Sequence, residues 1–257
     1  MKGSIIGDIV GAPFEMAKNK DINFEYAKER ETFTDDTILT IATMKSILNG
    51  TSYKEEAYNL ARIYHNYGYG AAFYNWFNSD NPEPYGSYGN GSAMRVSPIA
   101  LAFETEDKVL EEAKKSAEYS HNHLEGIKGA QAIALCIFMA KEGKNKYVIK
   151  NRIEELFEYD LSKTLNEIRP DYNFSAACMF SVPESIICFL ESTDYESAIR
   201  NAISLGGDAD TMACMAGGIS EVYYGEIPQH LEDRLNILPE EFKEVLTRFY
   251  EKYQKGN

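Results

Sequence analysis

The chain has 257 residues and a formal net charge of −14, the balance of 26 Lys and Arg against 40 Asp and Glu. A chain of this length can bury a substantial core without disulfides or structural zinc. The acidic balance argues against nonspecific binding to nucleic acid or to anionic membranes, which requires a basic face. It leaves a phosphate-bearing ligand open, because bound divalent cations invert the local field.

The four cysteines are scattered through apolar segments and form no CxxC motif and no Cys/His pair with zinc spacing. We therefore interpret them as reduced core residues. The N-terminus lacks the long apolar stretch of a signal peptide, and no run approaches the length of a membrane span. These features predict a soluble, cytoplasmic protein.

The first predicted element is a short apolar helix in which Gly3, Gly7 and Gly11 recur four residues apart. Glycine in a helix costs roughly 1 kcal/mol relative to alanine, so three of them indicate a packing or functional reason. The stripe would let another helix or a ligand approach the backbone closely. Pro13 ends this segment and leaves Glu15 on the following turn.

Acidic residues precede the second predicted helix. Thr34, Asp35 and Asp36 stand directly before an apolar run that ends near residue 48. One acidic N-cap is ordinary, because its oxygen accepts an orphan backbone N–H. A second, adjacent carboxylate repels the first and gains little from capping, so this pair indicates a role other than capping.

Helical periodicity dominates the rest of the chain, and strand-like alternation is scarce. Apolar residues with helical spacing predict helices over 53–64, 107–119 and 127–138, another after an N-cap at Asp194, and a last one that begins at Pro239. No low-complexity linker divides the chain. We therefore predict one all-α domain over residues 1–257.

The stretch 67–90 is long and irregular, and it is rich in Gly, Asn, Pro and aromatic residues, including the only tryptophan, Trp76. Loops of this length inside compact domains are usually functional or disordered. The aromatic density argues for order. We expect the stretch to lie on the core rather than to act as a lid that stacks on a ligand.

Two further segments carry polar groups ahead of predicted helices. Gly89-Asn90-Gly91-Ser92-Ala93-Met94-Arg95 would expose backbone N–H groups that suit a phosphate or a ribose hydroxyl, although a plain tight turn explains it equally well. Arg95 would pair with a phosphate or with a buried carboxylate. The segment Ser120-His121-Asn122-His123 has no metal-spaced partner and indicates polar contacts at the rim of a site.

A second acidic cluster, Gly206-Gly207-Asp208-Ala209-Asp210-Thr211, precedes an apolar helix. Like the first cluster, it offers two carboxylates and a Thr hydroxyl, the hard oxygen ligands that Mg²⁺, Mn²⁺ or Ca²⁺ prefer. If the two helix starts face each other, the six groups could hold two cations, which can activate a water and orient a substrate. We therefore interpret the two clusters as the metal site of an enzyme rather than as two unrelated acidic N-caps.

A competing pattern is the EExxE sequence Glu154-Glu155-Leu156-Phe157-Glu158, with an ExxD sequence over 191–194. All-α nucleotide pyrophosphohydrolases bind Mg²⁺ through such patterns. Here the first pattern lies on a charged helix face, where Glu runs are usually solvated, and the second includes the N-cap at Asp194. The pyrophosphohydrolase is therefore a minor alternative.

The motifs, in their order, resemble those of the ADP-ribosylglycohydrolase family, which includes arginine- and serine-directed ADP-ribosyl hydrolases and the dinitrogenase reductase-activating glycohydrolase. The resemblance rests on segments 7–15, 34–37, 89–95, 120–121 and 206–211, and so it covers nearly the whole chain. It implies a compact, single-domain orthogonal helical bundle, which agrees with the periodicity. It also implies cleavage of the glycosidic bond between ADP-ribose and a modified target.

The resemblance implies roles for individual residues. Two Mg²⁺ or Mn²⁺ ions would lie among the metal ligands Thr34, Asp35, Asp36, Asp208, Asp210 and Thr211. Glu15, Asp36 and Asp208 would act in catalysis, with Glu15 on a mobile flap. The ADP-ribose would be bound by Gly89, Asn90, Gly91, Ser92, Met94 and His121.

The expected substrate is an ADP-ribosylated protein side chain such as arginine, and the expected enzyme is a monomer. A catalytically silent ADP-ribose-binding protein on the same fold is the first alternative, and the pyrophosphohydrolase is the second. Arginine, serine, an acetyl ester and a nucleobase are all open as the leaving group. The segment 67–88 is the candidate for that choice.

Overall fold

The computed structural model describes residues 1–253, and the regular elements of this part of the chain are helices. The prediction of an all-α fold is therefore confirmed. Strand-like pairing in residues 1–253 is limited to one bridge between Gly89 and Ala177. No helix among these residues has the length and apolar character needed to cross a membrane.

The helices follow one another along the chain, and the longest stretches between them are 15–27 and 78–90. In order they are α1 (Lys2–Gly11), η1 (Ala12–Phe14), η2 (Lys28–Arg30), α2 (Asp35–Asn49), α3 (Tyr53–Ile63), α4 (Ala71–Phe77), α5 (Gly91–Met94), α6 (Ser97–Ala102), α7 (Glu106–Glu118), α8 (Leu124–Lys141), α9 (Lys146–Phe157), α10 (Leu165–Ile168), α11 (Cys178–Leu190), α12 (Tyr195–Ile203), α13 (Ala209–Tyr224), α14 (Gln229–Glu232), η3 (Asp233–Ile237) and α15 (Glu240–Tyr253).

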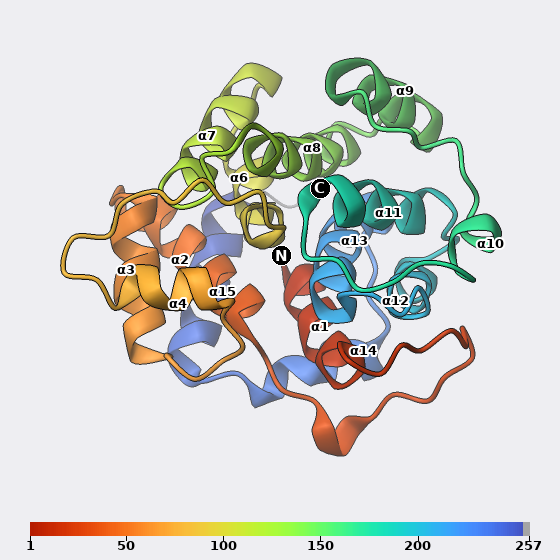
Figure 1. The fold of residues 1–257 in the computed structure, drawn as a ribbon, viewed down its shortest axis with the longest axis horizontal. Helices are drawn as coiled ribbons and strands as arrows, with labels where there is room; N and C mark the ends of the chain where they lie inside the picture. The colour runs from red at the N-terminus through yellow and green to blue at the C-terminus, as the bar shows by residue number, and fades with distance from the viewer. Residues whose placement is uncertain (254–257) are drawn as a thin grey trace.

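Helices α1 and α13 pack against each other in the middle of the molecule (Figure 1). The glycine stripe of α1 makes this approach possible, because a Cβ on Gly3 would lie 2.5 Å from the carbonyl oxygen of Gly217. A Cβ on Gly7 would lie 2.2 Å from that of Ala213. The close helix contact expected from the stripe is therefore confirmed.

The remaining helices surround this pair. On one side α2 packs on α3 and α15, and on the other α13 packs on α8, α11 and α12 (Figure 1). The helices predicted over 53–64, 107–119 and 127–138 correspond to α3, α7 and α8, of which α8 is longer at both ends. Asp194 caps α12 through a reciprocal pair of hydrogen bonds with Ser197, as its sequence position predicts.

The stretch 67–90 differs from its prediction as an irregular segment, because it contains α4. Phe73, Trp76 and Phe77 have the spacing of one helical face, and all three are buried. Phe73 stacks on Trp76 with 5.0 Å between ring centroids. Flanking Gly and Asn residues mask this short helical pattern in the sequence. The expectation that the aromatic residues pack on the core is confirmed for these three.

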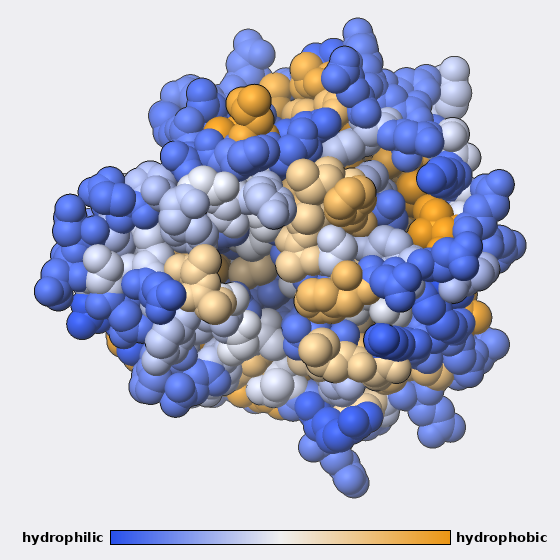
Figure 2. All heavy atoms as spheres, in the orientation of Figure 1, coloured by the Kyte–Doolittle hydropathy of each residue, from blue (hydrophilic) through white to orange (hydrophobic). Residues whose placement is uncertain are grey.

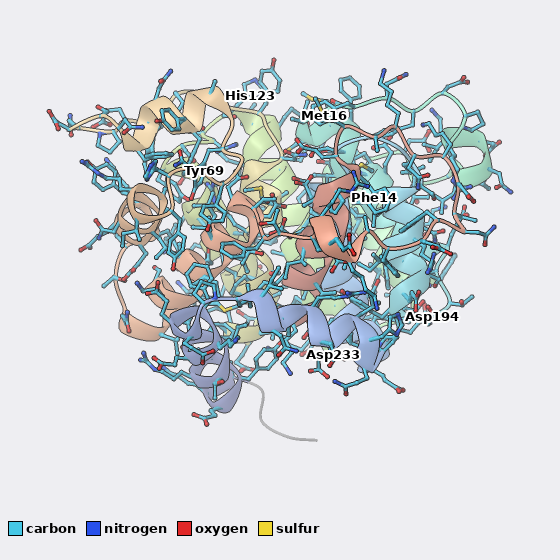
Figure 3. The ribbon with its side chains drawn as sticks, turned by 90° about the horizontal axis from the view of Figure 1, so that it is seen from below. Phe14, Met16, Tyr69, His123, Asp194 and Asp233 are labelled. Atoms are coloured by element: carbon cyan, nitrogen blue, oxygen red, sulfur yellow. The ribbon has the colours of Figure 1, made fainter. Side chains whose placement is uncertain are left out.

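The turn after α1 places Glu15 near the N-terminal ends of α2 and α13. Phe14 anchors the turn on the core by packing against Phe24, with 4.7 Å between ring centroids. Met16 is exposed on the other side of Glu15, and Figure 3 shows Phe14 and Met16 just after the end of α1. The four cysteines are buried and free, in agreement with the prediction of core thiols.

Candidate active site

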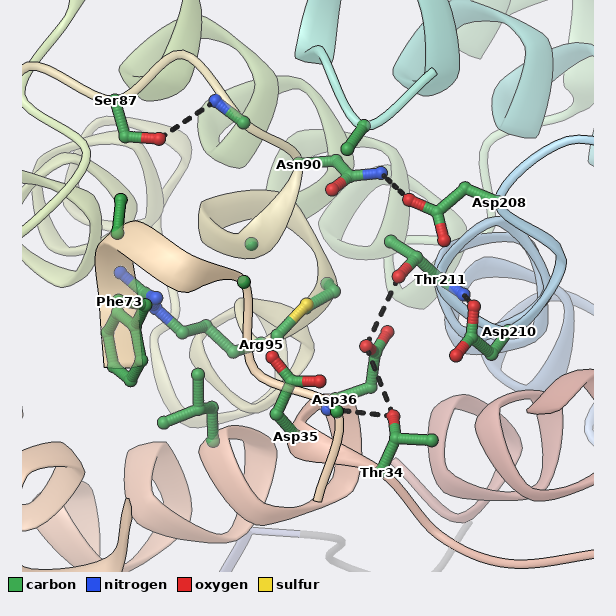
Figure 4. Close-up of a pocket in the computed structure, with 18 of the residues that line it drawn as sticks. Thr34, Asp35, Asp36, Phe73, Ser87, Asn90, Arg95, Asp208, Asp210 and Thr211 are labelled. Carbon is green, nitrogen blue, oxygen red and sulfur yellow. Dashed lines mark hydrogen bonds between the residues drawn. The ribbon is translucent and has the colours of Figure 1, made fainter. Parts of the chain in front are cut away.

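The two acidic clusters meet where the first turns of α2 and α13 face each other. The hydroxyl of Thr211 donates a 3.2 Å hydrogen bond to Oδ2 of Asp36, which joins residues 175 positions apart (Figure 4). Thr34 is the N-cap of α2 and accepts a hydrogen bond from the amide of Asp36. Asp208 stands at the N-cap position of α13, but its side chain makes no cap hydrogen bond. Its carboxylate is therefore available for another role.

A further carboxylate, Asp8 on α1, organises the first cluster from beneath. Its Oδ1 accepts the Thr34 hydroxyl at 2.7 Å, and its Oδ2 accepts the Thr34 amide at 2.9 Å. The amide of Thr37, at 3.1 Å, and the Thr37 hydroxyl also donate to Oδ2. Asp8 is fully buried. No role for Asp8 was predicted from the sequence, although a lone carboxylate within an apolar, glycine-striped helix was the available signal.

The second cluster is tied to the small-residue turn. The side-chain amide of Asn90 donates a 2.8 Å hydrogen bond to Oδ2 of Asp208 (Figure 4). Asp210 lies in the first turn of α13, and one of its oxygens accepts the backbone amide of Thr211 at 2.9 Å. The predicted substrate residue Asn90 therefore also positions a predicted metal ligand.

Two groups of carboxylates have oxygens close enough to share a cation. Oxygens of Asp8, Asp36 and Asp210 lie within 4.8 Å of one another, and so do oxygens of Glu15, Asp208 and Asp210. Asp210 belongs to both groups. Asp35 belongs to neither, although it lines the same cavity. The structure therefore brings five of the acidic groups into two adjacent oxygen clusters.

The donor set fits a hard divalent cation. Oδ1 of Asp36 is buried and has no hydrogen-bond partner in residues 1–253, so this carboxylate oxygen is available to bind a cation. Oxygen-only donors of this kind are typical of Mg²⁺ and Mn²⁺ sites. Asp8 is a weaker candidate ligand, because both of its oxygens are already occupied by the hydrogen bonds from Thr34 and Thr37.

The electrostatics of the cluster also favour a cation. Burial, followed by the charges of Asp8 and Asp35, raises the pKa of Asp36 well above its usual range. Burial and then the charge of Asp208 raise the pKa of Asp210 in the same direction. Burial is the main cause for Glu15 as well, whose pKa is raised further by Asp208. A bound cation would offset this mutual repulsion.

The clusters form one wall of a cavity of about 340 Å³, which opens as a hollow near the middle of the face in Figure 2. Five of the six predicted substrate-binding residues line it, together with all six predicted metal ligands. The lining residues are Glu15, Thr34, Asp35, Asp36, Leu39, Gly68, Gly70, Ala71, Ala72, Phe73, Tyr85, Ser87, Gly89, Asn90, Gly91, Met94, Arg95, His121, Phe174, Ala176, Asp208, Asp210 and Thr211.

Ser92 is the predicted substrate residue that does not line this cavity. It is fully buried, and its hydroxyl donates a 2.7 Å hydrogen bond to the carbonyl of Gly126. Its side chain therefore holds α5 against α8. Helix α5 is a single turn, and within residues 1–253 the backbone amides of Gly91 and Ser92 donate no hydrogen bond.

Arg95 is fully buried beside Phe73, in the wall of the cavity (Figure 4). No carboxylate in residues 1–253 forms an ion pair with it, so pairing with a buried carboxylate is the wrong alternative. Instead its Nη2 donates to the carbonyl of Ser116 and to the hydroxyl of Ser120, each at 3.0 Å. Nε and Nη1 are buried without a partner in the described residues.

The EExxE pattern does not form a metal site in this part of the chain. Glu154 accepts the amide of Leu161, and Glu155 pairs with Arg152 at 3.1 Å on the surface of α9. No cluster of potential metal ligands within residues 1–253 includes Glu154, Glu155 or Glu158. The minor alternative of a pyrophosphohydrolase therefore has no structural support here.

The chain is similar to known proteins in both sequence and fold. The sequence is 28% identical over 312 aligned residues to ADP-ribosylhydrolase ARH3 of Homo sapiens, with 89% of this chain and 86% of the relative covered. It is 25% identical to the putative ADP-ribosyl glycohydrolase L543 of Acanthamoeba polyphaga mimivirus, with coverages of 88% and 86%. A solved ADP-ribosylglycohydrolase-related protein complex shares the fold, with a TM-score of 0.75, 22% identity and coverages of 98% and 95%.

The family profile described as ADP-ribosylglycohydrolase matches residues 1–257, which is the whole chain. The expected resemblance is thereby confirmed. The chain belongs to the ADP-ribosylglycohydrolase family.

Proposed function

We propose that this protein is a metal-dependent hydrolase that cleaves the glycosidic bond between ADP-ribose and a modified protein side chain. The observation that carries the proposal is the contact between the starts of α2 and α13, where Thr211 reaches Asp36. That contact unites two acidic clusters from distant parts of the chain at the wall of one cavity. Family membership supplies ADP-ribose as the substrate class.

The cofactor in this proposal is a pair of Mg²⁺ or Mn²⁺ ions held by Thr34, Asp35, Asp36, Asp208, Asp210 and Thr211. Asp210 belongs to both sets of neighbouring carboxylates, and Oδ1 of Asp36 has no partner. Both observations support a two-cation arrangement. When bound, such cations activate a water, orient the ribose hydroxyls and stabilise the charge that develops as the bond breaks.

The protein residues would divide the remaining work. An oxygen of Glu15 lies within 4.8 Å of oxygens of Asp208 and Asp210, which are two of the proposed metal ligands. Glu15 would therefore be placed to accept a proton from the attacking water. Asn90 holds Asp208 in place. Gly89, Gly91, Met94 and His121 line the path along which the ADP-ribose would extend, and the free amides of Gly91 and Ser92 suit an oxygen of the diphosphate or ribose.

We propose arginine as the modified side chain. Five carboxyl groups line the cavity, from Glu15, Asp35, Asp36, Asp208 and Asp210, and Asp8 lies beneath them. With all six ionised, two divalent cations and the Arg95 guanidinium would leave one net negative charge. A negative wall favours a cationic leaving group such as guanidinium over a neutral hydroxyl. We also retain the proposal of a monomeric, cytoplasmic protein.

The proposal is tested by measuring free ADP-ribose released from ADP-ribosylated arginine and serine peptides and from modified nucleic acid, each with Mg²⁺, Mn²⁺ or EDTA. Asp208→Ala is compared with Asp107→Asn, a control that removes an exposed carboxylate on α7. We expect metal-dependent release from the arginine peptide, a loss of at least a hundredfold in Asp208→Ala and no loss in the control.

Other outcomes are equally informative. Release from the serine peptide alone would retain the hydrolase and overturn the choice of arginine. Tight ADP-ribose binding without release from any substrate would favour the silent binding protein. Equal losses of rate and of stability in Asp208→Ala would mean that Asp208 supports the helix start rather than the reaction.

A further inference from the structure

Three polar side chains form a chain of hydrogen bonds that ends at the cavity. The guanidinium of Arg95 donates to the hydroxyl of Ser120 at 3.0 Å, and that hydroxyl lies 2.8 Å from Nδ1 of His121. All three residues are buried, with exposed fractions of 0%, 0% and 5%. Solvent therefore does not compete for these contacts.

The direction of this chain follows from the chemistry of arginine. A guanidinium has only donors, so the Ser120 oxygen must accept the bond from Arg95. The single hydroxyl proton of Ser120 is then free to be donated to Nδ1 of His121. No other acceptor for that proton occurs among residues 1–253, because the Ser120 hydroxyl has these two partners alone. A proton on Nδ1 would leave the buried Ser120 hydroxyl without an acceptor, and this cost favours an unprotonated Nδ1.

The other ring nitrogen faces the cavity. Nε2 of His121 makes no hydrogen bond within the described part of the chain, and His121 is one of the lining residues. A Cβ on Gly91 would lie 3.0 Å from Nε2, so this nitrogen lies directly beside the small-residue turn. Gly91 leaves the space in which a ligand atom could approach the ring.

We propose that Arg95 and Ser120 are positioning residues that hold His121 as the neutral Nε2–H tautomer, so that it serves as a fixed hydrogen-bond donor to an oxygen of the bound ligand. His121 would then take no part in proton transfer. The tautomer is a property of the chain itself. Only the identity of the acceptor, an oxygen of ADP-ribose, rests on the proposed function.

The surroundings of the ring support this assignment. The charged and titratable groups near it are Arg95, which directly follows α5 and reaches the ring through Ser120, and Tyr85, whose ring centroid lies 5.9 Å away. Burial, and then the positive charge of Arg95, lower the pKa of His121 well below its usual range. Burial raises the pKa of Tyr85 to about 12, so the phenol stays neutral. No anion next to the ring favours the imidazolium.

The tautomer is read directly by long-range ¹H–¹⁵N NMR of the Mg²⁺-loaded full chain labelled at histidine, from pH 5.5 to 8.5. The protein has four histidines, so the His121 signals are assigned by their loss in His121→Gln. We expect Nε2–H and a bare Nδ1 at every pH. An imidazolium, or a proton on Nδ1, in the wild-type protein would overturn the inference whether or not any activity is found.

Two Ser120 variants test the positioning role. Ser120→Ala removes the donor to Nδ1, and so we expect mixed tautomers or protonation of His121 within this pH range. Ser120→Thr retains the hydroxyl and should restore the wild-type pattern. An unchanged spectrum in a folded Ser120→Ala would show that the Arg95–Ser120 chain does not determine the tautomer. If Ser120→Ala does not fold, the wild-type spectrum and the His121 variants still decide the proposal.

Kinetics separates a donor from a proton-transfer group. His121→Gln keeps an N–H donor of similar reach, whereas His121→Leu has none. A fixed donor predicts that kcat/KM falls about tenfold or more in His121→Leu and much less in His121→Gln, with the shape of the pH profile unchanged. General acid–base catalysis would instead give similar losses of 10²–10⁴ in both variants, with a limb missing from the pH profile.

Discussion

The side-chain amide of Asn90 lies 2.8 Å from Oδ2 of Asp208, and this hydrogen bond joins the small-residue turn to the start of α13 across 118 positions. Asn90 is itself held by its backbone amide, which donates to the carbonyl of Ala176 at 2.7 Å. The contact orients a carboxylate that no helix cap holds. The small-residue turn and the second acidic cluster are thus directly connected.

The first prediction concerns this contact. Asn90→Ala should lower the rate of ADP-ribose release about tenfold or more, because a hydrogen bond to a charged group contributes about 1.5–3 kcal/mol. Asn90→Asp should be more damaging despite its equal size, since it places a carboxylate against Asp208. Steady-state kinetics and Mg²⁺ titration by calorimetry measure both effects. Equal rates in Asn90→Ala and wild type would show that Asp208 is oriented by other contacts.

The second prediction separates the two kinds of buried carboxylate. Asp8→Asn should lower the free energy of unfolding by about 2–3 kcal/mol in EDTA, because the amide cannot accept from all the donors of Thr34 and Thr37. Asp36→Asn should leave the metal-free protein at least as stable as wild type, since it removes one of several mutually repelling charges. Urea denaturation in EDTA gives both values.

Adding Mg²⁺ extends this comparison. At a hundred times its dissociation constant, a cation that binds only the folded state adds about 2.7 kcal/mol to the free energy of unfolding. We expect this gain in the wild-type protein and its loss in Asp36→Asn. A full gain in Asp36→Asn would remove Asp36 from the proposed ligands.

The third prediction concerns the packing that brings the clusters together. Gly7→Ala should lower the free energy of unfolding by about 3 kcal/mol, because its Cβ would lie 2.2 Å from the carbonyl oxygen of Ala213. Gly70→Ala is the matched control, since its Cβ would have no neighbour within 4 Å and its φ is −58°. The control should be neutral or slightly stabilising. Chemical denaturation of both proteins tests the contrast.

The fourth prediction is a pH dependence of stability outside the acidic clusters. Burial raises the pKa of Glu184 on α11 from 4.5 to about 7, and its Oε2 is buried without a partner in residues 1–253. The folded state therefore holds the proton more tightly than the unfolded state. This contribution is fully present below pH 4.5, and it is lost as the pH rises through about 7.

Glu184→Gln should consequently be more stable than wild type by about 1–3 kcal/mol at pH 8, and by little or nothing at pH 4.5. Thermal or urea denaturation at the two pH values measures the difference between the proteins. A constant difference across this range would mean that Glu184 titrates alike in the folded and unfolded states.

Much of the fold was predictable because its causes are local. The helical spacing of apolar residues predicted α3, α7 and α8. The glycine stripe of α1 predicted a close contact, because glycine destabilises a helix and three of them require a compensating packing interaction. The motifs at the two helix starts were predictable as well. Their sequences already contain more carboxylates than capping requires.

The sequence by itself therefore determined the all-α class, the family and most of the residues along the cavity. The tertiary structure alone decided which of these residues act together. It placed Asp36 against Thr211, made Asp8 the acceptor for Thr34 and Thr37, and turned Ser92 away from the cavity. It also gave Arg95 the carbonyl of Ser116 and the hydroxyl of Ser120 as partners in place of a carboxylate. Such partners depend on how helix ends meet in space, and helical periodicity specifies only which face of each helix is buried.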